Sequence, residues 1–389
     1  MTGGSHAELP MIQAAKKRGD YVITTGSNTE GIGHRYADLY IPGDFSNREF
    51  VCHLAEIQNV DAIVSGCNDF AYLSTAYACD QLNLPGHDSL ATAKLIHHKN
   101  EFRQTIKKLG IRTPKVVACS PGDDVTRACM GLRFPILVKP VDLTGGKGVT
   151  VCERAEDLQA AFDAACKITR ESVVILEEFI KGTNHGASVL LKNERIIFGF
   201  IDNEQYYLNP YLVSGACYPS SVPQETIGQL YTDIECLAAD LHLADGLFHV
   251  QFIVDETGHA VMIDPCRRAP GDLYVSLVQY ATEVDYPLAI LKAECGEELP
   301  DHYTVIPHNI ARECIMTDHN GYVDSIWIDP EVQTCIMKQM IWGQKGDRIE
   351  DYKKYKAGIL FIEESDAEKL YRKVQAFHEY VGIRVKSFA

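Results

Sequence analysis

The 389-residue sequence lacks an excess of basic residues, a long apolar run and a basic or apolar leader, and each absence excludes a class of protein. Lys and Arg number 37 against 53 Asp and Glu, which gives a formal charge of -16. Because phosphate backbones and anionic membranes are bound through Lys and Arg, we expect neither nucleic acid nor a membrane as a partner. No stretch resembles a transmembrane helix. The N-terminal "MTGGSHAELP" does not resemble a signal peptide.

Paired cysteine motifs are also lacking. The thirteen cysteines are scattered singly, without a CxxC pair or a repeated spacing. Such an unpatterned set is typical of thiols kept reduced, most of them small buried side chains, and it predicts a cytoplasmic protein.

Two common nucleotide motifs are missing as well. The glycine turn at 145–148 is not a Walker A loop, because Lys147 is followed by Gly148 and not by Ser or Thr. The "GGSHAE" near the N-terminus lacks the spaced third glycine of a dinucleotide fingerprint. A dehydrogenase built on the N-terminal region therefore fits poorly.

The first ninety residues alternate strand and helix patterns. Segments 20–27 and 60–69 read as strands, and 7–19 and 70–83 read as helices. This order predicts βαβ units around a parallel sheet. The "TGGSH" stretch resembles the turn after a first strand, although only Met1 and Thr2 stand there. Either that edge strand is absent or the chain starts upstream, and the sequence leaves both open.

The segment 95–115 predicts one helix with Leu95, Phe102 and Ile106 on its apolar stripe. Lys99 falls on the same stripe. A lysine in this position commonly extends its ammonium to the rim, so Lys99 is informative only if other cations converge with it.

The stretch "FPILVKPVDLTGGKGVTVC" (134–152) is an apolar strand that ends on Lys139 and leads through glycines into a second strand. Glycines let backbone N–H groups approach an anion closely. A desolvated lysine is costly without an anionic partner. By itself, however, the stretch reads more readily as a plain β-hairpin turn than as a phosphate-binding loop.

The hairpin expected at 247–264 carries a candidate cation site. With a four-residue connection, Gln251 would oppose Met262 and His249 would oppose Asp264, which puts Gln251 and Asp264 on one face. Two oxygen-bearing side chains, followed by two arginines, suit a magnesium ion that carries phosphates. The alternative is that Asp264 caps a strand and Gln251 faces solvent.

Lys99, "FPILVKP", "LTGGKGV", "VVILEEFIKG" and "HVQFIVDETGHAVMIDPCRR" occur in the order and approximate spacing of the ATP-grasp superfamily, which the chain resembles over nearly its whole length. The resemblance implies an α/β and α+β fold in three parts. These are an N-terminal Rossmann-like βαβ domain (1–93), a two-subdomain ATP-grasp core (94–300, with a lid at about 116–178) and a small α+β domain (301–389).

The resemblance also implies a set of site residues. ATP would be bound by Lys99, Lys139, Thr144, Gly145, Gly146, Lys147, Gly148, Glu177, Glu178, Phe179, Ile180 and His185. Magnesium, or manganese in its place, would be held by Gln251 and Asp264. Lys139 and Arg268 would be catalytic, with Arg268 facing the reacting carboxylate. Substrate would contact Arg267, Arg268, Tyr207, Tyr211 and Ser214.

Three positions depart from the pattern of the family. Gln251 stands where Glu is usual, Cys266 where Asn commonly completes the metal shell, and His185 where an acid is frequent. A neutral amide binds a hard cation less strongly than a carboxylate, and a thiol is a poor magnesium ligand. These departures imply one firmly held metal, an altered substrate or a feeble enzyme.

Within the superfamily the chain looks like the carboxylate–amine ligases of the amino-acid and dipeptide type, related to biotin-carboxylase-like and carbamoyl-phosphate-synthase-like proteins. The resemblance implies that a carboxylate is activated by ATP as an acyl phosphate and coupled to an amine. Biotin carboxylases follow their arginine with a Gln-Val-Glu run that handles bicarbonate. Here "APGD" follows Arg268, which disfavours bicarbonate as the substrate. A bicarbonate-activating enzyme and a catalytically weak nucleotide-binding module are the alternatives. A homodimer is a further expectation, and His185, His249, Tyr206 and Tyr207 are candidate bases.

Overall fold

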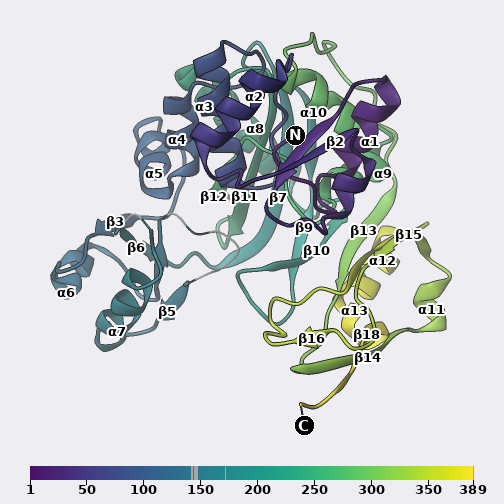
Figure 1. The fold of residues 1–389 in the computed structure, drawn as a ribbon. Helices are drawn as coiled ribbons and strands as arrows, with labels where there is room; N and C mark the ends of the chain where they lie inside the picture. The colour runs from purple at the N-terminus through teal and green to yellow at the C-terminus, as the bar shows by residue number, and fades with distance from the viewer. Residues whose placement is uncertain (142, 144–147, 171, 389) are drawn as a thin grey trace.

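The computed structural model describes residues 1–141, 143, 148–170 and 172–388. These residues form five sheets with helices packed between and around them. In Figure 1 a small sheet with its own helices projects at the lower left, the N-terminal helices lie at the top, and the C-terminal strands lie at the lower right. The mixed α/β and α+β organisation expected from the sequence is confirmed.

The N-terminal part carries the predicted parallel pairing, of β1 (Ile23–Gly26) with β2 (Leu39–Pro42). Thr2 forms parallel bridges to Thr25 on one side and to Ser65 on the other. The expected strand at 60–69 is wrong except for the bridge at Ser65, and α3 already begins at Asp69. The helical elements of this part are α1 (Leu9–Arg18), the 3-10 helix η1 (Ile32–Tyr36), α2 (Arg48–Gln58) and α3 (Asp69–Leu82).

The single helix expected over 95–115 is wrong. The chain forms α4 (Leu90–His97) and α5 (Lys99–Lys108), with extended backbone at His98 (φ -94°, ψ 108°) between them. The break places Lys99 at the first turn of α5, where its side chain is buried. An apolar stripe can continue across such a break, so its periodicity did not reveal it.

The lid is an antiparallel sheet of order β3–β6–β4–β5. Apolar side chains of α7, Leu158 and Phe162, pack with Val138 and Leu176 of the sheet in one core. The linker into the lid is tied to the central sheet, because the Met262 N–H donates to the Arg112 carbonyl (3.2 Å). The elements of the lid are β3 (Val116–Cys119), α6 (Val125–Ala128), the 3-10 helix η2 (Cys129–Gly131), β4 (Ile136–Pro140), β5 (Thr150–Cys152), α7 (Ala155–Cys166) and β6 (Val174–Glu178).

The central sheet has the order β12–β11–β7–β8 and is antiparallel throughout. Its strands are β7 (Gly182–Lys192), β8 (Arg195–Ile201), β11 (Gly246–Asp255) and β12 (Ala260–Cys266). The helix α8 (Gln224–Leu241) packs Leu230, Ile234 and Leu237 into the apolar cluster of this sheet. The helices α9 (Tyr274–Thr282) and α10 (Tyr286–Glu294) follow the hairpin, and α10 packs against α1 and β11.

A five-stranded sheet of order β15–β17–β13–β10–β9 joins the core to the C-terminal part. Its strands β9 (Asn203–Tyr206) and β10 (Val213–Tyr218) precede the domain boundary expected at 300/301, and the others follow it. The boundary stays a prediction, and hydrogen bonding crosses it. The later elements are β13 (Asn309–Ile315), β14 (Gly321–Ile328), α11 (Pro330–Gln333), β15 (Ile336–Ile341), β16 (Arg348–Ile349), β17 (Gly358–Glu364), α12 (Ala367–Gln375), α13 (Phe377–Tyr380) and β18 (Val381–Lys386).

All thirteen cysteines are free thiols. Within the part of the chain that the structure describes, no helix combines the length and the apolar character needed to cross a bilayer.

Candidate functional site

The hairpin β11–β12 brings Gln251 and Asp264 directly opposite each other. The expected register was wrong. Val254 pairs with Ala260 and Phe252 with Met262, and a β-bulge between Gln251 and Phe252 shifts the remaining pairs by one. Because the odd connection and the bulge offset each other, the expected shared face of Gln251 and Asp264 is confirmed.

Lys99 reaches this face from α5. Its Nζ lies 3.1 Å from Asp264 Oδ1, although the two residues are far apart in the sequence. The Lys99 side chain is only 9% exposed, so its ammonium does not extend to the surface. The buried ammonium of Lys99 is therefore paired with Asp264, the predicted metal ligand. Burying this charge without an anionic partner would be costly.

Lys139, at the end of β4, is held in a buried ion pair. Its Nζ lies 2.7 Å from Glu177 Oε1, and Glu177 Oε2 accepts from Arg103 Nε at 3.1 Å. Burial lowers the pKa of Lys139 in spite of the attraction of Glu177, and the charges of Asp264 and Lys99 also act on it. Lys139 therefore belongs to the same cluster of charges as Lys99 and Asp264.

The glycine loop falls mainly outside the described residues. Thr144, Gly145, Gly146 and Lys147 lie there, and their expected contacts with phosphate stay predictions. Gly148 is described and has φ 72°, and a Cβ on it would lie 2.4 Å from Ile168 Cδ1. The left-handed backbone therefore favours glycine at this end of the loop, and a Cβ would also require the Ile168 side chain to shift.

The segment expected to contact adenine runs along β6. The side chains of Glu177 and Glu178 are both buried in contacts within the protein, and Glu178 Oε1 accepts from the Arg133 N–H at 3.0 Å. Phe179 follows with 39% exposure, and its N–H donates to the Pro135 carbonyl. The backbone of β6 is paired with β3 and β4, whereas Phe179 is exposed and Ile180 is half-buried. The expected contacts of this segment with adenine stay predictions.

His185 is buried on β7 and makes two contacts. Its Nε2 lies 2.7 Å from Thr183 Oγ1, and its Nδ1 lies 3.0 Å from the Asp202 carbonyl. Burial lowers its pKa, so the ring is neutral and held in place. Its predicted contact with ATP would need a change of partner at Nε2.

Sequence reasoning missed two acids on the segment 202–206. Gln251 Nε2 donates to Glu204 Oε1 at 2.7 Å, and Tyr206 donates to Glu204 Oε2 at 2.6 Å. Burial raises the pKa of Glu204, and the charge of Asp264 acts in the same direction. Asp202 is buried nearby, accepts from Tyr274, and has its pKa raised to about 8, chiefly by burial.

The alternating pattern Asp202–Glu204–Tyr206 was the available signal in the sequence. Period-two alternation puts the three side chains on one side of a strand. The strand β9 is short and polar, so no apolar run marked it.

The two arginines after β12 have different surroundings. Arg268 Nε donates to Asp69 Oδ1 at 2.8 Å, and His97 Nδ1 lies 3.2 Å from the same oxygen. Arg267 donates to Asp88 at 2.8 Å and to the carbonyls of Leu247 and Ala244. Because Arg267 is buried and engaged with protein groups, we treat it as structural and leave it out of the substrate site.

The protonation state of Cys266 also argues against metal binding by its thiol. Its thiol is buried and donates to the Arg268 carbonyl at 3.4 Å, and burial raises its pKa to about 11. A thiol in this state is protonated and is no ligand for a hard cation. Within the described residues no three His, Cys, Asp or Glu side chains gather as a metal-ligand set.

Three of the residues expected to contact substrate belong to the five-stranded sheet or its loops: Tyr207 and Tyr211 connect β9 to β10, and Ser214 lies on β10. Tyr207 stacks on His378 with ring centroids 3.5 Å apart, and Ser214 is buried with its hydroxyl on the Gln205 carbonyl. Tyr211 is half-buried, and burial raises its pKa. Their substrate contacts stay predictions.

A second cluster of charges, unforeseen from the sequence, lies beside this loop. Lys356 pairs with Asp272 and donates to the Val213 carbonyl at 3.0 Å. Although burial opposes ionisation, His6, Lys356 and Arg312 hold the pKa of Asp272 well below its usual range. Asp272 has left-handed backbone (φ 53°), which is strained for a residue that is not glycine.

Residues 132–274 match the family model described as the ATP-grasp domain. The D-alanine–D-alanine ligase of Trichlorobacter lovleyi is 26% identical over 201 residues, which span 51% of this chain and 63% of that protein. The carbamoyl phosphate synthase large chain of Vibrio cholerae is 25% identical over 221 residues, which span 53% of this chain and 20% of the relative. The matches thus span less than two thirds of these relatives.

Solved structures agree over almost the full chain. The L-amino acid ligase from Bacillus licheniformis superimposes with a TM-score of 0.84 at 17% identity and covers 99% of this chain and 98% of its own. The biotin carboxylase domain of the 2-oxoglutarate carboxylase from Hydrogenobacter thermophilus, solved with MgADP and bicarbonate, gives 0.78 at 18% identity, with 98% and 90% covered. At these identities the likeness establishes the fold. Within this fold, residues 132–274 form an ATP-grasp domain.

Proposed function

We propose that this protein is an ATP- and Mg²⁺-dependent ligase that activates a carboxylate as an acyl phosphate and couples it to an amine, with release of ADP and phosphate. The names of two similar proteins, a D-alanine–D-alanine ligase and an L-amino acid ligase, support this class of reaction. The substrates are proposed only as a small carboxylic acid and a small amine.

One observation carries the proposal. Lys99 contacts Asp264, which lies opposite Gln251, and the charges of Lys99 and Asp264 act on Lys139, although these residues come from three different parts of the chain. A triphosphate needs cations and a metal seat in the same place, because its charges repel an anionic nucleophile until they are neutralised. Each lysine now pairs with a carboxylate, and a bound triphosphate would offer it a second anionic partner.

The oxygen-rich donor set fits magnesium. Asp264 offers a carboxylate, and the bond from Gln251 Nε2 to Glu204 leaves the amide oxygen of Gln251 as the atom for a cation. Mg²⁺ is commonly bound by one or two carboxylates together with phosphates. Asp264, Gln251 and Glu204 would hold the ion, which would supply Lewis-acid stabilisation of the phosphates.

Arg268 is a further cation of the site. Its Nε is bound to Asp69 and its Nη1 lies 3.4 Å from the Ala269 carbonyl, so the fork is oriented while Nη2 is left for an acid substrate. A fixed guanidinium suits a carboxylate that must be aligned with the γ-phosphate. We propose that Arg268 orients the acid and that Asp69 positions Arg268.

The candidate bases are poorly suited to take a proton from the amine. Burial lowers the pKa of His249 to about 3, and its Nδ1 is bonded to Ser188. Burial raises the pKa of Tyr206 well above its usual value, and this hydroxyl donates to Glu204. We therefore assign no base to the amine step.

The test is ADP release by the purified chain across paired acids and amines. The proposal expects ADP only when acid and amine are both present, and a hydroxamate when hydroxylamine replaces the amine. AMP and pyrophosphate as products would exclude an acyl phosphate. Bicarbonate-stimulated ADP release without an amine would indicate carboxyphosphate chemistry.

A second candidate is a nucleotide-binding module with little catalysis, favoured by Gln251 and the protonated thiol of Cys266. Calorimetry of Mg-ATP binding, run beside the ADP assay, separates the two. Tight binding without turnover over a broad panel would favour the module. Cytoplasmic location and a homodimer stay predictions.

A further inference from the structure

The thiol of Cys335, in the C-terminal part of the chain, lies between an ammonium and a carboxylate. Its Sγ is 3.0 Å from Lys373 Nζ and 3.1 Å from Glu364 Oε1. Lys373 Nζ also lies 2.6 Å from Glu364 Oε1, so each of the three groups contacts the other two. None of these residues is among those expected to bind ATP, metal or substrate.

Three elements of the fold hold this triad together. Cys335 stands between α11 and β15, Glu364 is the last residue of β17, and Lys373 lies near the C-terminal end of α12. The Glu363 N–H donates to the Cys335 carbonyl at 2.9 Å, which fixes the backbone of Cys335 beside β17. Because α12 packs against β13 and β17, Lys373 is carried by an anchored helix.

The triad is sheltered from bulk water but open to a small molecule. The side chains of Lys373 and Glu364 are 14% and 13% exposed, and Cys335 is half-buried. Contacts between partly buried charges are screened less than those at the surface. A partly exposed sulfur can still meet an oxidant as small as hydrogen peroxide.

The two charged neighbours suit the Cys335 thiol to oxidation. The thiol donates to Glu364, which can accept its proton, and the Lys373 ammonium would stabilise the resulting thiolate. The thiolate is the form of cysteine that reacts with peroxide. Although burial opposes it, Cys335 and Glu364 raise the pKa of Lys373, so this ammonium is charged at rest.

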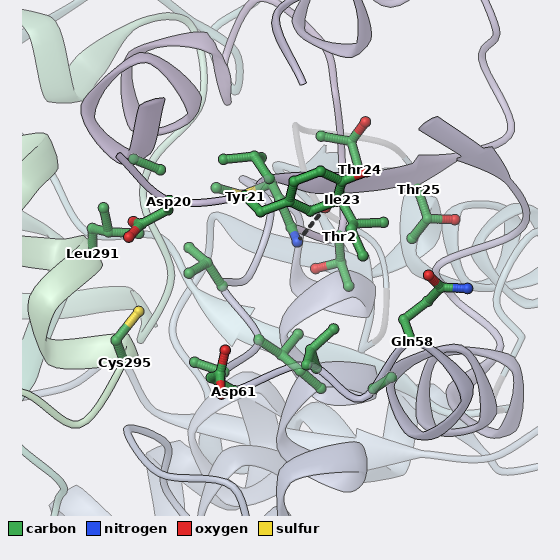
Figure 2. Close-up of a pocket in the computed structure, with 18 of the residues that line it drawn as sticks. Thr2, Asp20, Tyr21, Ile23, Thr24, Thr25, Gln58, Asp61, Leu291 and Cys295 are labelled. Carbon is green, nitrogen blue, oxygen red and sulfur yellow. Dashed lines mark hydrogen bonds between the residues drawn. The ribbon is translucent and has the colours of Figure 1, made fainter. Parts of the chain in front are cut away.

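Two other cysteines contact a cation that cannot serve in the same way. Cys295 lines the cavity of about 520 Å³ in Figure 2, and its Sγ lies 3.7 Å from Arg18 Nη2. Cys314 is buried, with its Sγ 3.5 Å from Arg312 Nη1. A guanidinium stays protonated in proteins and therefore offers sulfur no lone pair. Cys335 differs from both because its contact is a lysine nitrogen.

We infer that Cys335 and Lys373 form a modification site at which a small hydroperoxide joins Sγ to Nζ through a covalent S–N bond. The contacts of both residues with Glu364 place the proton acceptor that this chemistry needs beside them. The inference is independent of the ligase activity.

The modification has two steps. In the first, the thiolate attacks peroxide and the O–O bond breaks, which oxidises sulfur to a sulfenic acid and reduces peroxide to water, since the leaving hydroxide takes the thiol proton from Glu364. In the second, Lys373 gives a proton to Glu364, its amine attacks sulfur, and the S–O bond breaks as a second water leaves. Sulfenic acids condense with nitrogen in this way to give sulfenamides. The thiol and the amine together lose two hydrogen atoms.

The test is peptide mass spectrometry of the purified chain after treatment with hydrogen peroxide and alkylation of the remaining thiols. The peptides that carry Cys335 and Lys373 are expected as one cross-linked species, about 2 Da lighter than their sum, which dithiothreitol separates again. The bond would join residues 38 positions apart, so Tm should rise by about 5 °C or more and fall back on reduction.

Lys373→Arg is the matched variant, because it keeps the positive charge beside Glu364 and removes the amine. It should give no cross-link, and Cys335 should instead remain a sulfenic acid that dimedone labels. Lys373→Met should give the same result without the charge. Cys236, an exposed cysteine on α8, serves as the internal control and should be oxidised without joining a lysine.

Three outcomes would overturn the inference. If Cys335 stays a thiol under peroxide that oxidises Cys236, the triad does not activate its sulfur. If Cys335 of the parent protein accumulates as sulfenic acid without a cross-link, Lys373 does not attack it. A cross-link from Cys335 to any other lysine would contradict the geometry of the triad.

Discussion

Gln251 Nε2 donates to Glu204 Oε1 at 2.7 Å, and Asp264 stands opposite Gln251 across the hairpin. The amide thus sits between two carboxylates and separates their charges. A glutamate at position 251 would add a third negative charge, which only a cation could offset. The neutral amide of Gln251 therefore suits its hydrogen bond to Glu204, an acid that comes from a different strand, β9.

Gln251→Glu is expected to raise Mg²⁺ affinity about tenfold, which corresponds to about 1.4 kcal/mol. Added ligand charge strengthens oxygen sites for hard cations. Without metal the same variant should unfold at lower temperature, because the introduced carboxylate would lie against Glu204. Calorimetry with Mg-ADP and melting curves with and without Mg²⁺ measure both effects.

Gln229→Glu is the matched control for this variant. Gln229 also donates its amide to an acid, Asp233, at 2.9 Å, but it lies exposed on α8. It should leave Mg²⁺ affinity unchanged. If Gln251→Glu is as indifferent to Mg²⁺ as Gln229→Glu, the metal does not bind at the hairpin.

The hairpin also indicates how far the sequence could predict this site. Period-two alternation placed Gln251 and Asp264 on one face, and the structure confirms it. The pairing register of β11 with β12 depended on a β-bulge, which no residue pattern in either strand indicated. The motif spacing predicted the fold, which similar solved structures share over almost the full chain.

One local backbone break and two long-range contacts could not be predicted from the sequence, for physical reasons. The break at His98 lies within an apolar stripe that a single helix would also produce. Glu204 approaches Gln251 only because β9 packs against β7, a contact between segments that periodicity does not relate. The pairing of Arg267 with Asp88 joins residues 179 positions apart.

Lys139→Met should weaken ATP binding strongly. A charge-assisted contact is worth about 1.5–3 kcal/mol, so affinity should fall by about one to two orders of magnitude. Stability should also fall, because Glu177 loses one of its two cationic partners, although Arg103 remains. Calorimetric ATP affinity and urea unfolding measure the two effects separately.

Lys115→Met is the comparison for Lys139→Met. Lys115 lies 3.7 Å from Glu178 with its side chain 61% exposed, so its removal should change stability by less than about 0.5 kcal/mol. Its ATP affinity should match the parent protein. Unchanged ATP affinity in Lys139→Met would remove this lysine from the nucleotide site.

Gly148→Ala should destabilise the lid by about 1–3 kcal/mol. The residue has φ 72°, and a Cβ would lie 2.4 Å from Ile168 Cδ1 and 3.0 Å from Pro140 Cγ. Gly131→Ala, in the same subdomain, meets no atom within 4 Å and serves as the control. Faster proteolysis of the lid is the measurement, and equal rates for the two variants would contradict the strain at Gly148.

Glu294→Gln tests a buried acid at the C-terminal end of α10. Burial raises the pKa of Glu294 from 4.5 to about 8, although the Ser65 N–H donates to it at 2.6 Å. Between about pH 4.5 and 8 the folded state keeps a proton that the unfolded state has lost. The contribution of Glu294 to the free energy of unfolding therefore falls as pH rises through this window and is constant outside it.

Glutamine cannot ionise, so the variant should lose this part of the pH dependence, a slope of up to about 1.4 kcal/mol per pH unit. Above pH 8 it should be more stable than the parent protein, because no charge has to be buried. Urea unfolding at several pH values across the window gives both slopes. Glu297→Gln, at an exposed acid paired with Arg18, should keep the slope of the parent. If Glu294→Gln and the parent protein share one slope, Glu294 is ionised in the folded state and its contacts with Ser65 outweigh its burial.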